Sequence, residues 1–415
     1  LEIPELGVFG PLLEGSGKRE MSTTMALVRM MNSLIKQKSI GDRIVPIVPD
    51  EARTFGMEGM FRQIGIYAHE GQKYEPVDRE QLMYYREDQK GQFLQEGINE
   101  DGAISSWIAA ATSYSNSGIQ MIPFYTFYSM FGFQRVGDLI WAAGDIQARG
   151  FLIGGTSGRT TLNGEGLQHE DGQSQIMAAN VPNCISYDPT FAYELMVIIQ
   201  NGLKRMFENQ ENVFYYITTL NENYPHPEMK KGQEENIIKG MYLFQQGGKG
   251  SKRVQLMGSG SILREVIAAA NILAEDFGVQ ADVWSCPSFN ELKRDGDDCV
   301  RWNLMHPDQK PRIPHVTACL EKHSGPVVAA TDYVKLFADQ IRAYVGRNYH
   351  VLGTDGFGRS DTRASLRRHF EVNRYYVTVA ALKTLADEGT IPAKTVKSAI
   401  RKYKLDPEKP NPLNV

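Results

Sequence analysis

One stretch of the sequence decides the fold: RVQLMGSGSILREVIAAANILAEDFGVQADVWSC, residues 253–286. A short apolar run comes first, apolar residues at helical spacing follow, and a second apolar run closes the stretch. This order is typical of a strand–helix–strand unit, the building block of parallel sheets. A second unit of the same kind follows over residues 326–358. We therefore predict a doubly wound, mostly parallel-sheet α/β domain over residues 230–415.

The first half of the chain alternates in the same way. Apolar residues recur at helical spacing over residues 22–36, where Ser22 or Thr23 can cap the helix. Residues 92–115 are typical of a strand, a turn and an alanine-rich helix, and further strand–helix pairs follow. The pattern predicts a second doubly wound, mostly parallel-sheet α/β domain over residues 1–229.

Two polar segments interrupt this alternation. Residues 221–240 contain two prolines and many charges, and we interpret them as an interdomain linker. Residues 70–91 are polar and directly precede the predicted strand that leads to Glu100. This second segment is either a plain surface loop or a mobile lid beside a site.

The bulk composition argues against several classes of function. A chain of 415 residues, 42% hydrophobic and 23% charged, fits a globular protein of about two or three domains. The net charge of −4 provides no basic face for nucleic acid, and no run of about 18 apolar residues is present to span a membrane. The four cysteines lack CxxC spacing, which indicates reduced thiols in a cytoplasmic protein. The chain begins without Met, so we expect a piece of a longer or processed polypeptide.

Two glycine-rich motifs each allow a structural and a binding interpretation. GSGS, residues 258–261, stands between a predicted strand and helix but lacks the third glycine of a dinucleotide loop. We interpret it as a turn, with an anion site as the alternative. In TDGFGRSDTR, residues 354–363, Ser360 or Asp361 can cap the next helix, and two arginines can bind a phosphate or carboxylate. The structural interpretation is favoured here as well.

Two acidic stretches flanked by glycine are candidate sites. In QEGINEDGA, residues 95–103, Glu100 begins a predicted helix, where an ordinary first-turn acid is stabilised by the helix dipole. In GEGLQHEDGQSQ, residues 164–175, His169 precedes Glu170 in a loop without helical or strand periodicity. From the residues alone, a chemical role for this imidazole and a plain surface position are equally well supported.

Five motifs together resemble a known family. They occur in the order VPDEARTFGMEGMF, QFLQEGINEDGA, PFYTFYSMFGFQR, TTLNGEGLQHEDGQS and GTDGFGRSDTR. Over essentially all its length the chain resembles the middle and C-terminal domains of the homodimeric, bacterial-type decarboxylase component of the pyruvate dehydrogenase complex, a transketolase-like thiamine diphosphate enzyme. The resemblance implies a pyrimidine-binding domain over residues 1–229 and a transketolase C-terminal-like domain over residues 230–415.

The resemblance also implies a cofactor site. Glu100 matches the catalytic glutamate that hydrogen-bonds a ring nitrogen of the aminopyrimidine and favours its imino form, which takes the proton from the thiazolium carbon. Tyr128 and Phe131 match the aromatic pair that lies against the aminopyrimidine. Ile98 matches an apolar residue that touches the cofactor.

The same resemblance implies substrate residues and a reaction. His169 matches a catalytic histidine that faces the substrate or the first covalent adduct. Asp50 and Glu51 match acids near the substrate pocket, where Glu51 can order water or tune proton transfer. The implied reaction is oxidative decarboxylation of pyruvate with reductive acetylation of a lipoyl group on the acetyltransferase core of the complex. The alternatives are a transketolase-type ketol transfer and a non-catalytic assembly module.

One part of the family pattern is absent from the sequence. The GDG motif and the later Asn that bind magnesium and the diphosphate do not occur together, and RDGDD, residues 294–298, has the wrong order and is interpreted as an acidic surface loop. The resemblance implies that the Mg²⁺ ligands come from an N-terminal diphosphate-binding domain absent from this chain, so no metal ligand is assigned. It also implies a homodimer, because the cofactor of this family lies between subunits.

Overall fold

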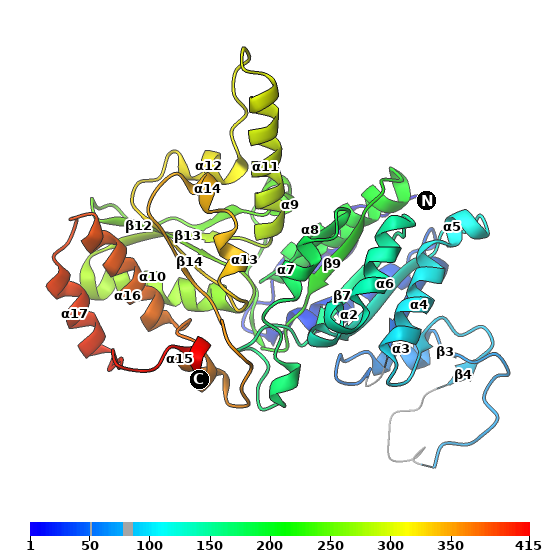
Figure 1. The fold of residues 1–415 in the computed structure, drawn as a ribbon. Coiled ribbons are helices and arrows are strands. Elements are labelled where there is room, and N and C mark those ends of the chain that lie inside the picture. The colour runs from blue at the N-terminus through cyan, green and yellow to red at the C-terminus, as the bar shows by residue number, and fades with distance from the viewer. Residues whose placement is uncertain (50–51, 78–85) are drawn as a thin grey trace. The chain divides into compact units, whose positions relative to one another are not determined.

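The computed structural model describes residues 1–49, 52–77 and 86–415. Asp50 and Glu51 lie outside the described residues, as does the 78–85 part of the 70–91 segment. The chain divides into two compact units (Figure 1). Unit 1 comprises Leu1–Ser157, Met177–Ile185 and Phe191–Met229, and unit 2 comprises Gly158–Ile176, Ser186–Thr190 and Lys230–Val415.

Unit 1 is built on a six-stranded sheet with the order β5-β2-β6-β7-β9-β8. The pairs β5–β2, β2–β6, β6–β7 and β7–β9 are all parallel. The strands are β2 (Ile44–Val48), β5 (Leu94–Gln95), β6 (Ile122–Tyr128), β7 (Phe151–Gly155), β8 (Cys184–Tyr187) and β9 (Phe214–Thr218). Strands of a parallel sheet are covered on both faces, which explains why they occur as continuous apolar runs in the sequence.

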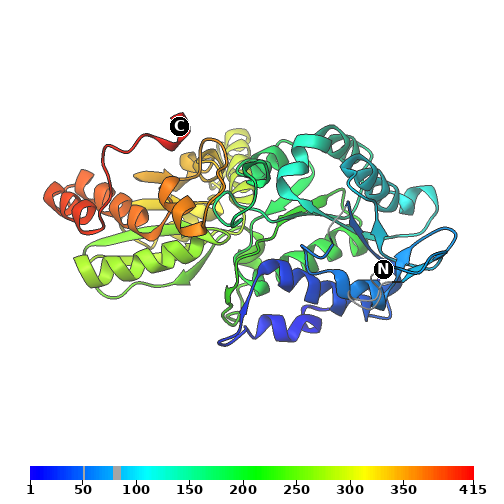
Figure 2. The ribbon, with the colours of Figure 1, turned by 90° about the horizontal axis from the view of Figure 1, so that it is seen from below.

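Helices cover both faces of this sheet. In Figure 2 the cyan helices α4 (Glu100–Ala111) and α6 (Phe133–Asp145) lie on one side, and the blue helix α2 (Thr23–Ile35) lies on the other. The predicted cap Ser22 is confirmed, because its hydroxyl accepts a hydrogen bond from the Met25 N–H at 3.1 Å. The remaining helices before residue 229 are α1 (Gly10–Leu13), α3 (Glu58–Gln63), α5 (Ser113–Asn116), α7 (Ser174–Ala179) and α8 (Ala192–Leu203).

Unit 2 confirms the strand–helix–strand prediction for residues 253–286, since β12 and β13 are parallel and α10 connects them. α10 ends at Phe277 and is followed by Gly278, whose φ of +60° is left-handed and favours glycine. The sheet order is β11-β13-β12-β14-β15, and β11 is antiparallel to its neighbour. The strands are β11 (Tyr242–Gln245), β12 (Arg253–Gly258), β13 (Gln280–Ser285), β14 (Val327–Ala330) and β15 (Tyr349–Leu352). The helices are α9 (Glu234–Ile238), α10 (Ile262–Phe277), α11 (Phe289–Met305), α12 (His315–Leu320), α13 (Leu336–Asp339), α14 (Arg342–Val345), α15 (Arg363–His369), α16 (Arg374–Asp387) and α17 (Ala393–Lys402).

The unit 2 sheet is also covered on both faces (Figure 1). Helices α10 and α16 pack together and against β13 and β14. A buried apolar cluster joins the sheet to helices α11–α14 through side chains such as Trp284, Phe289 and Phe337. This arrangement confirms the predicted α/β fold class with two mostly parallel sheets.

The linker interpretation of residues 221–240 is wrong for their first half. There β10 (Tyr224–Pro225) pairs with β1 (Glu20–Met21), and residues up to Met229 belong to unit 1. Tyr224 and His226 are buried, their rings stack at 4.8 Å, and His226 Nδ1 accepts the Ala192 N–H at 2.9 Å. The polar composition of residues 221–240 did not indicate that the side chains of Tyr224 and His226 are buried.

Two further details differ from the sequence interpretation. RDGDD, residues 294–298, lies inside helix α11 and not in a loop. Ser288 caps the start of that helix, and Gly296 of the motif packs against the ring of Tyr344. Helix α15 is capped by Thr362, whose hydroxyl accepts from the Ser365 N–H, so the cap lies one or two residues later than predicted.

Candidate active site

Two candidate residues of unit 1 lie at the carboxyl ends of parallel strands in the same sheet. Glu100 begins α4 shortly after β5 ends at Gln95, and Tyr128 is the last residue of β6. β5 and β6 flank β2 in the sheet, and the three strands run in the same direction. Ligands of open α/β sheets bind outside the carboxyl ends of the strands, so both residues lie at the edge where a ligand is expected.

The local sequence fixes the position of Glu100. Gly97 adopts a φ of +73° in the turn after β5, and Asn99 caps α4 by accepting a hydrogen bond from the Gly102 N–H at 3.0 Å. The prediction that Glu100 begins a helix is confirmed. Its side chain is only 13% exposed, so its carboxylate is more shielded from water than that of an ordinary first-turn acid.

An arginine that no sequence pattern singled out, Arg135, pairs with Glu100. Arg135 Nη1 lies 2.8 Å from Glu100 Oε1, and the Arg135 guanidinium lies 4.0 Å from the centre of the Phe131 ring. Phe131 meets Tyr128 edge to face, with ring centres 6.1 Å apart and planes at 73°. Arg135 therefore contacts two of the predicted cofactor residues, and Phe131 in turn contacts the third, Tyr128. The signal of Arg135 in the sequence is its place at the end of the aromatic motif PFYTFYSMFGFQR.

A buried tyrosine lies behind this group. The Tyr125 hydroxyl donates to the main-chain carbonyl of Glu100 at 3.5 Å. Burial raises the pKa of Tyr125 well above its ordinary value, and the negative charges of Glu100 and Asp101 raise it further. Tyr125 therefore stays protonated and contributes a hydrogen bond instead of a charge.

A cavity of about 670 Å³ opens beside the turn that precedes Glu100, and its walls include Arg53, Tyr74, Glu87 and Gly97. Tyr74 and Glu87 belong to the described parts of the 70–91 segment, and the Tyr74 hydroxyl donates to Glu87 Oε1 at 2.5 Å. Next to Gly97, the predicted cofactor residue Ile98 is 80% exposed. The volume is that of a small-molecule site.

His169 belongs to unit 2, whereas the predicted cofactor residues belong to unit 1. Leu167–His169 form a single 3-10 turn, in which the His169 N–H donates to the Gly166 carbonyl at 2.9 Å. The side chain of His169 is partly exposed, while that of the next residue, Glu170, is fully buried. The role of His169 toward the substrate stays a prediction. The same holds for Asp50 and Glu51, which lie outside the described residues.

The two glycine-rich motifs have partners inside unit 2. In GSGS, the Ser259 hydroxyl donates to the buried carboxylate of Asp188 at 2.7 Å. The Ser261 hydroxyl forms a hydrogen bond with the hydroxyl of Thr161. In TDGFGRSDTR, Arg363 Nε donates to the Thr161 carbonyl at 2.6 Å. These contacts support the structural interpretation of both motifs.

No group of three or more His, Cys, Asp or Glu side chains among the described residues is arranged to hold a metal ion. Residues 1–49, 52–77 and 86–415 therefore supply no such cluster for the magnesium ion implied by the resemblance. In the same part of the chain, no helix combines the length and the apolar character needed to cross a membrane.

Solved transketolases share the fold. The transketolase of Campylobacter jejuni subsp. jejuni superposes with a TM-score of 0.63 at 16% identity, over 90% of this chain and 49% of that one. The transketolase of Leishmania mexicana gives a TM-score of 0.67 at 15% identity, over 92% and 48%. A chain described as a split gene transketolase, inactive beta4 tetramer, gives 0.56 at 13% identity, over 88% of this chain and 98% of that one. These likenesses define a transketolase-like fold.

The sequence comparisons narrow this class to a family. Residues 1–227 match the pyruvate dehydrogenase E1 component middle domain, and residues 240–373 match the transketolase-like C-terminal domain. The chain belongs to the family of the pyruvate dehydrogenase E1 component middle domain. The resemblance drawn from the five motifs is thereby confirmed.

Curated relatives agree with this assignment. Proteins named pyruvate dehydrogenase E1 component from Cupriavidus necator, Pseudomonas aeruginosa and Escherichia coli (strain K12) are each 63% identical to the chain. The matches cover 100%, 99% and 99% of this chain, and 47%, 47% and 46% of those proteins. The chain thus spans about half the length of the curated relatives it matches.

Proposed function

We propose that this chain forms the aminopyrimidine side of a thiamine diphosphate site that decarboxylates pyruvate oxidatively. Family membership and the 63% identity to proteins named pyruvate dehydrogenase E1 component support the proposal. The acetyl group is then transferred to a lipoyl group on the acetyltransferase core of the complex, which is reduced in the process. The enzyme acts as a homodimer in the cytoplasm under this proposal.

The observation that carries the proposal is the group formed by Glu100, Arg135, Phe131 and Tyr128. Two aromatic rings and the exposed Ile98 fit a flat, partly apolar ring such as an aminopyrimidine. A single shielded carboxylate at the start of α4 fits a hydrogen bond to a ring nitrogen. The residues of unit 1 therefore suit the pyrimidine half of the cofactor.

Each residue of the group has a distinct task in this proposal. When bound, thiamine diphosphate would supply the nucleophilic carbon needed to decarboxylate a 2-oxo acid such as pyruvate. Arg135 contacts Oε1 of Glu100, and we assign proton exchange with the ligand to Oε2. Tyr125 stays neutral and fixes the main chain of Glu100. Under this proposal, residues outside this chain bind the metal and the diphosphate.

A second candidate function is a non-catalytic assembly module. It is favoured by the likeness to the split gene transketolase chain, which is described as inactive and is covered over 98% of its length. Under this candidate, the 415 residues by themselves do not decarboxylate pyruvate. A ketol transfer between sugars finds less support, because the identity to the solved transketolases is 16% or lower.

Glu100→Ala in the complete enzyme tests the proposal. We expect the rate of pyruvate decarboxylation to fall on the order of 100-fold or more, because the group that exchanges the proton is removed. Asp101→Ala is the matched control, since it removes an exposed acid from the same helical turn, and its rate should stay within about 3-fold of wild type. Near-normal turnover of Glu100→Ala, or equal losses in both variants, would make Glu100 an ordinary first-turn acid.

A further inference from the structure

The loop that carries His169 is bound along its length to a distant segment of unit 2. We define the His169 loop as residues 158–173 and the clasp as residues 354–363, which follow β15. Arg159 of the loop donates through Nη1 to two clasp carbonyls at 2.5 and 2.6 Å. The Gly164 N–H donates to a third clasp carbonyl at 3.2 Å, and Arg363 of the clasp donates to a loop carbonyl at 2.6 Å. The two segments therefore form one structural element.

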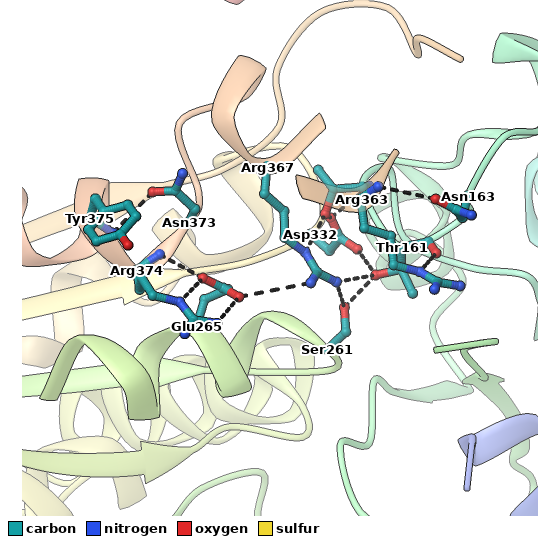
Figure 3. Close-up of polar contacts among 11 residues, drawn as sticks. Thr161, Asn163, Ser261, Glu265, Asp332, Arg363, Arg367, Asn373, Arg374 and Tyr375 are labelled. Atoms are coloured by element: carbon teal, nitrogen blue, oxygen red, sulfur yellow. Dashed lines mark hydrogen bonds and ion pairs between the residues drawn. The ribbon is translucent and has the colours of Figure 1, made fainter. Parts of the chain in front are cut away.

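A buried carboxylate fixes the beginning of the loop. Asp332 Oδ1 accepts hydrogen bonds from the N–H and the hydroxyl of Thr160 at 2.9 and 2.6 Å. Asp332 Oδ2 accepts the Thr161 hydroxyl at 2.5 Å, and Arg367 donates to the same hydroxyl at 3.4 Å (Figure 3). All of these side chains are buried, so this end of the loop is firmly held.

The other end of the loop is held by the carboxyl group of Glu170. Glu170 Oε2 accepts a hydrogen bond from the Arg359 N–H of the clasp at 2.7 Å. Glu170 is 0% exposed, and among the described residues its Oε1 has no hydrogen-bond partner. A Cβ at Gly358 would lie 2.8 Å from the Glu170 Cβ and 2.5 Å from the Leu167 carbonyl. Only glycine at this position lets the clasp approach so closely.

We propose that Glu170 is a positioning residue for His169, because its carboxyl group joins the loop to the clasp at the residue that follows His169. His169 is the preceding residue, and its N–H is bonded inside the same 3-10 turn. A displacement of Glu170 therefore moves the His169 side chain. The effect on pyruvate turnover rests on the proposed function, whereas the contact between loop and clasp does not.

Protonation of Glu170 sets the strength of this contact. Burial raises the pKa of Glu170, the Arg359 N–H lowers it, the charge of Asp332 raises it and Arg159 lowers it, and the net pKa is about 7. A carboxyl group with a raised pKa in the closed state stabilises that state fully below its solvent value of 4.5, and the stabilisation is lost as the pH rises through about 7. The constant for opening the contact consequently rises by at most roughly 300-fold over this window.

The first test measures hydrogen exchange in Glu170→Gln, which keeps the shape of the side chain and removes its titration. Exchange of loop and clasp peptides is followed in the complete enzyme from about pH 5.5 to 8.5 and corrected for the intrinsic rate. We expect protection to fall roughly 30-fold across this range in wild type and by less than about 3-fold in Glu170→Gln. Glu321→Gln, at an exposed glutamate of unit 2, is the matched control and should behave as wild type. An equal fall in all three proteins overturns the proposal.

The second test measures kcat/KM for pyruvate over the same range. Glu170→Gln should lack the part of the decline in kcat/KM that develops as the pH rises toward about 7, and Glu321→Gln should retain it. Gly358→Ala separates loop and clasp without changing a charge, so it should lower both protection and kcat/KM at every pH. If hydrogen exchange changes as expected but the complete enzyme does not turn over pyruvate, the proposed function is refuted and the contact between loop and clasp is supported. Full activity of Gly358→Ala with a loosened loop refutes the positioning role.

Discussion

Replacing Glu265 by alanine is expected to destabilise unit 2 by about 3 to 5 kcal/mol, because it removes a carboxylate that lies against the buried cation Arg367. Figure 3 shows Glu265 between two arginines. Its carboxylate accepts three hydrogen bonds from Arg374, at 2.8, 3.0 and 2.9 Å, and Arg367 Nη1 lies 3.9 Å from Oε1.

Exposure decides which of the two arginines dominates this loss. Arg374 is 44% exposed, so water replaces much of its pair, and its share is at most about 1 kcal/mol. Arg367 is only 7% exposed, and Glu265 only 8%. Most of the expected loss therefore comes from Arg367.

The same pair predicts how the loss depends on pH. Burial raises the pKa of Glu265, but the hydrogen bonds and charge of Arg374 and the charge of Arg367 outweigh it, so the net pKa is lowered. A carboxyl group with a lowered folded pKa contributes stability above its unfolded value of 4.5, and this stability is lost as the pH falls through the folded pKa. The difference between wild type and Glu265→Ala should therefore shrink in acid.

Urea unfolding, followed by hydrogen exchange of unit 2 peptides at neutral pH and near pH 4, measures both effects. Glu275→Ala removes an exposed acid from the same helix and should change the free energy of unfolding by no more than about 0.5 kcal/mol. A loss below about 1 kcal/mol for Glu265→Ala would mean that Asp332 and the neighbouring hydroxyl groups stabilise the charge of Arg367 without Glu265. The reasoning would then be wrong. A loss that is the same at both pH values would refute the assignment of the lowered pKa.

Two further predictions concern substrate turnover in the complete enzyme. His169→Ala should leave thiamine diphosphate affinity nearly unchanged and lower the rate or affinity for pyruvate by roughly 10- to 1,000-fold, as measured by paired titrations with cofactor and pyruvate. Collapse of cofactor binding with normal pyruvate kinetics per occupied site would move His169 to the cofactor side. The described ends of the 70–91 segment should exchange amide hydrogens faster in the free enzyme than with a bound mimic of the intermediate, and equal exchange would leave a plain surface loop.

The regular parts of the fold were readable from the sequence because periodicity reports burial directly. Residues 253–286 show apolar runs for two covered strands and helical spacing between them, and the structure has β12, α10 and β13 at these places. The cap at Ser22 was readable for a local reason, since its hydroxyl bonds an N–H only three residues away. Errors arose where polar composition was taken as a sign of a loop. Tyr224 and the glycine of RDGDD are explained by what they pack against, which no local pattern contains.

In the candidate site, too, the features set by adjacent residues were predictable from the sequence, and those set by long-range contacts were not. The position of Glu100 at the start of a helix follows from Asn99 and Gly97 beside it, so the sequence predicts it. Arg135 lies on another helix, and its pairing with Glu100 depends on how α4 and α6 pack on the sheet. The burial of Glu170 depends on a clasp about 190 residues later in the chain. Contacts of this range have no signature in the spacing of either segment.

The clasp also explains why GTDGFGRSDTR, a motif with no assigned catalytic residue, is one of the five motifs that resemble the family. TTLNGEGLQHEDGQS contains the candidate histidine, whereas GTDGFGRSDTR contains no residue assigned to catalysis. The second motif nevertheless supplies carbonyls to Arg159, an N–H to Glu170 and a glycine that permits close approach. The sequence of the second motif is therefore constrained by its main-chain hydrogen bonds and by the close approach of Gly358 to the loop, and not by a reactive side chain. A loop without regular structure can hold an imidazole in one place only when another segment satisfies its polar groups, and in unit 2 that segment is the clasp.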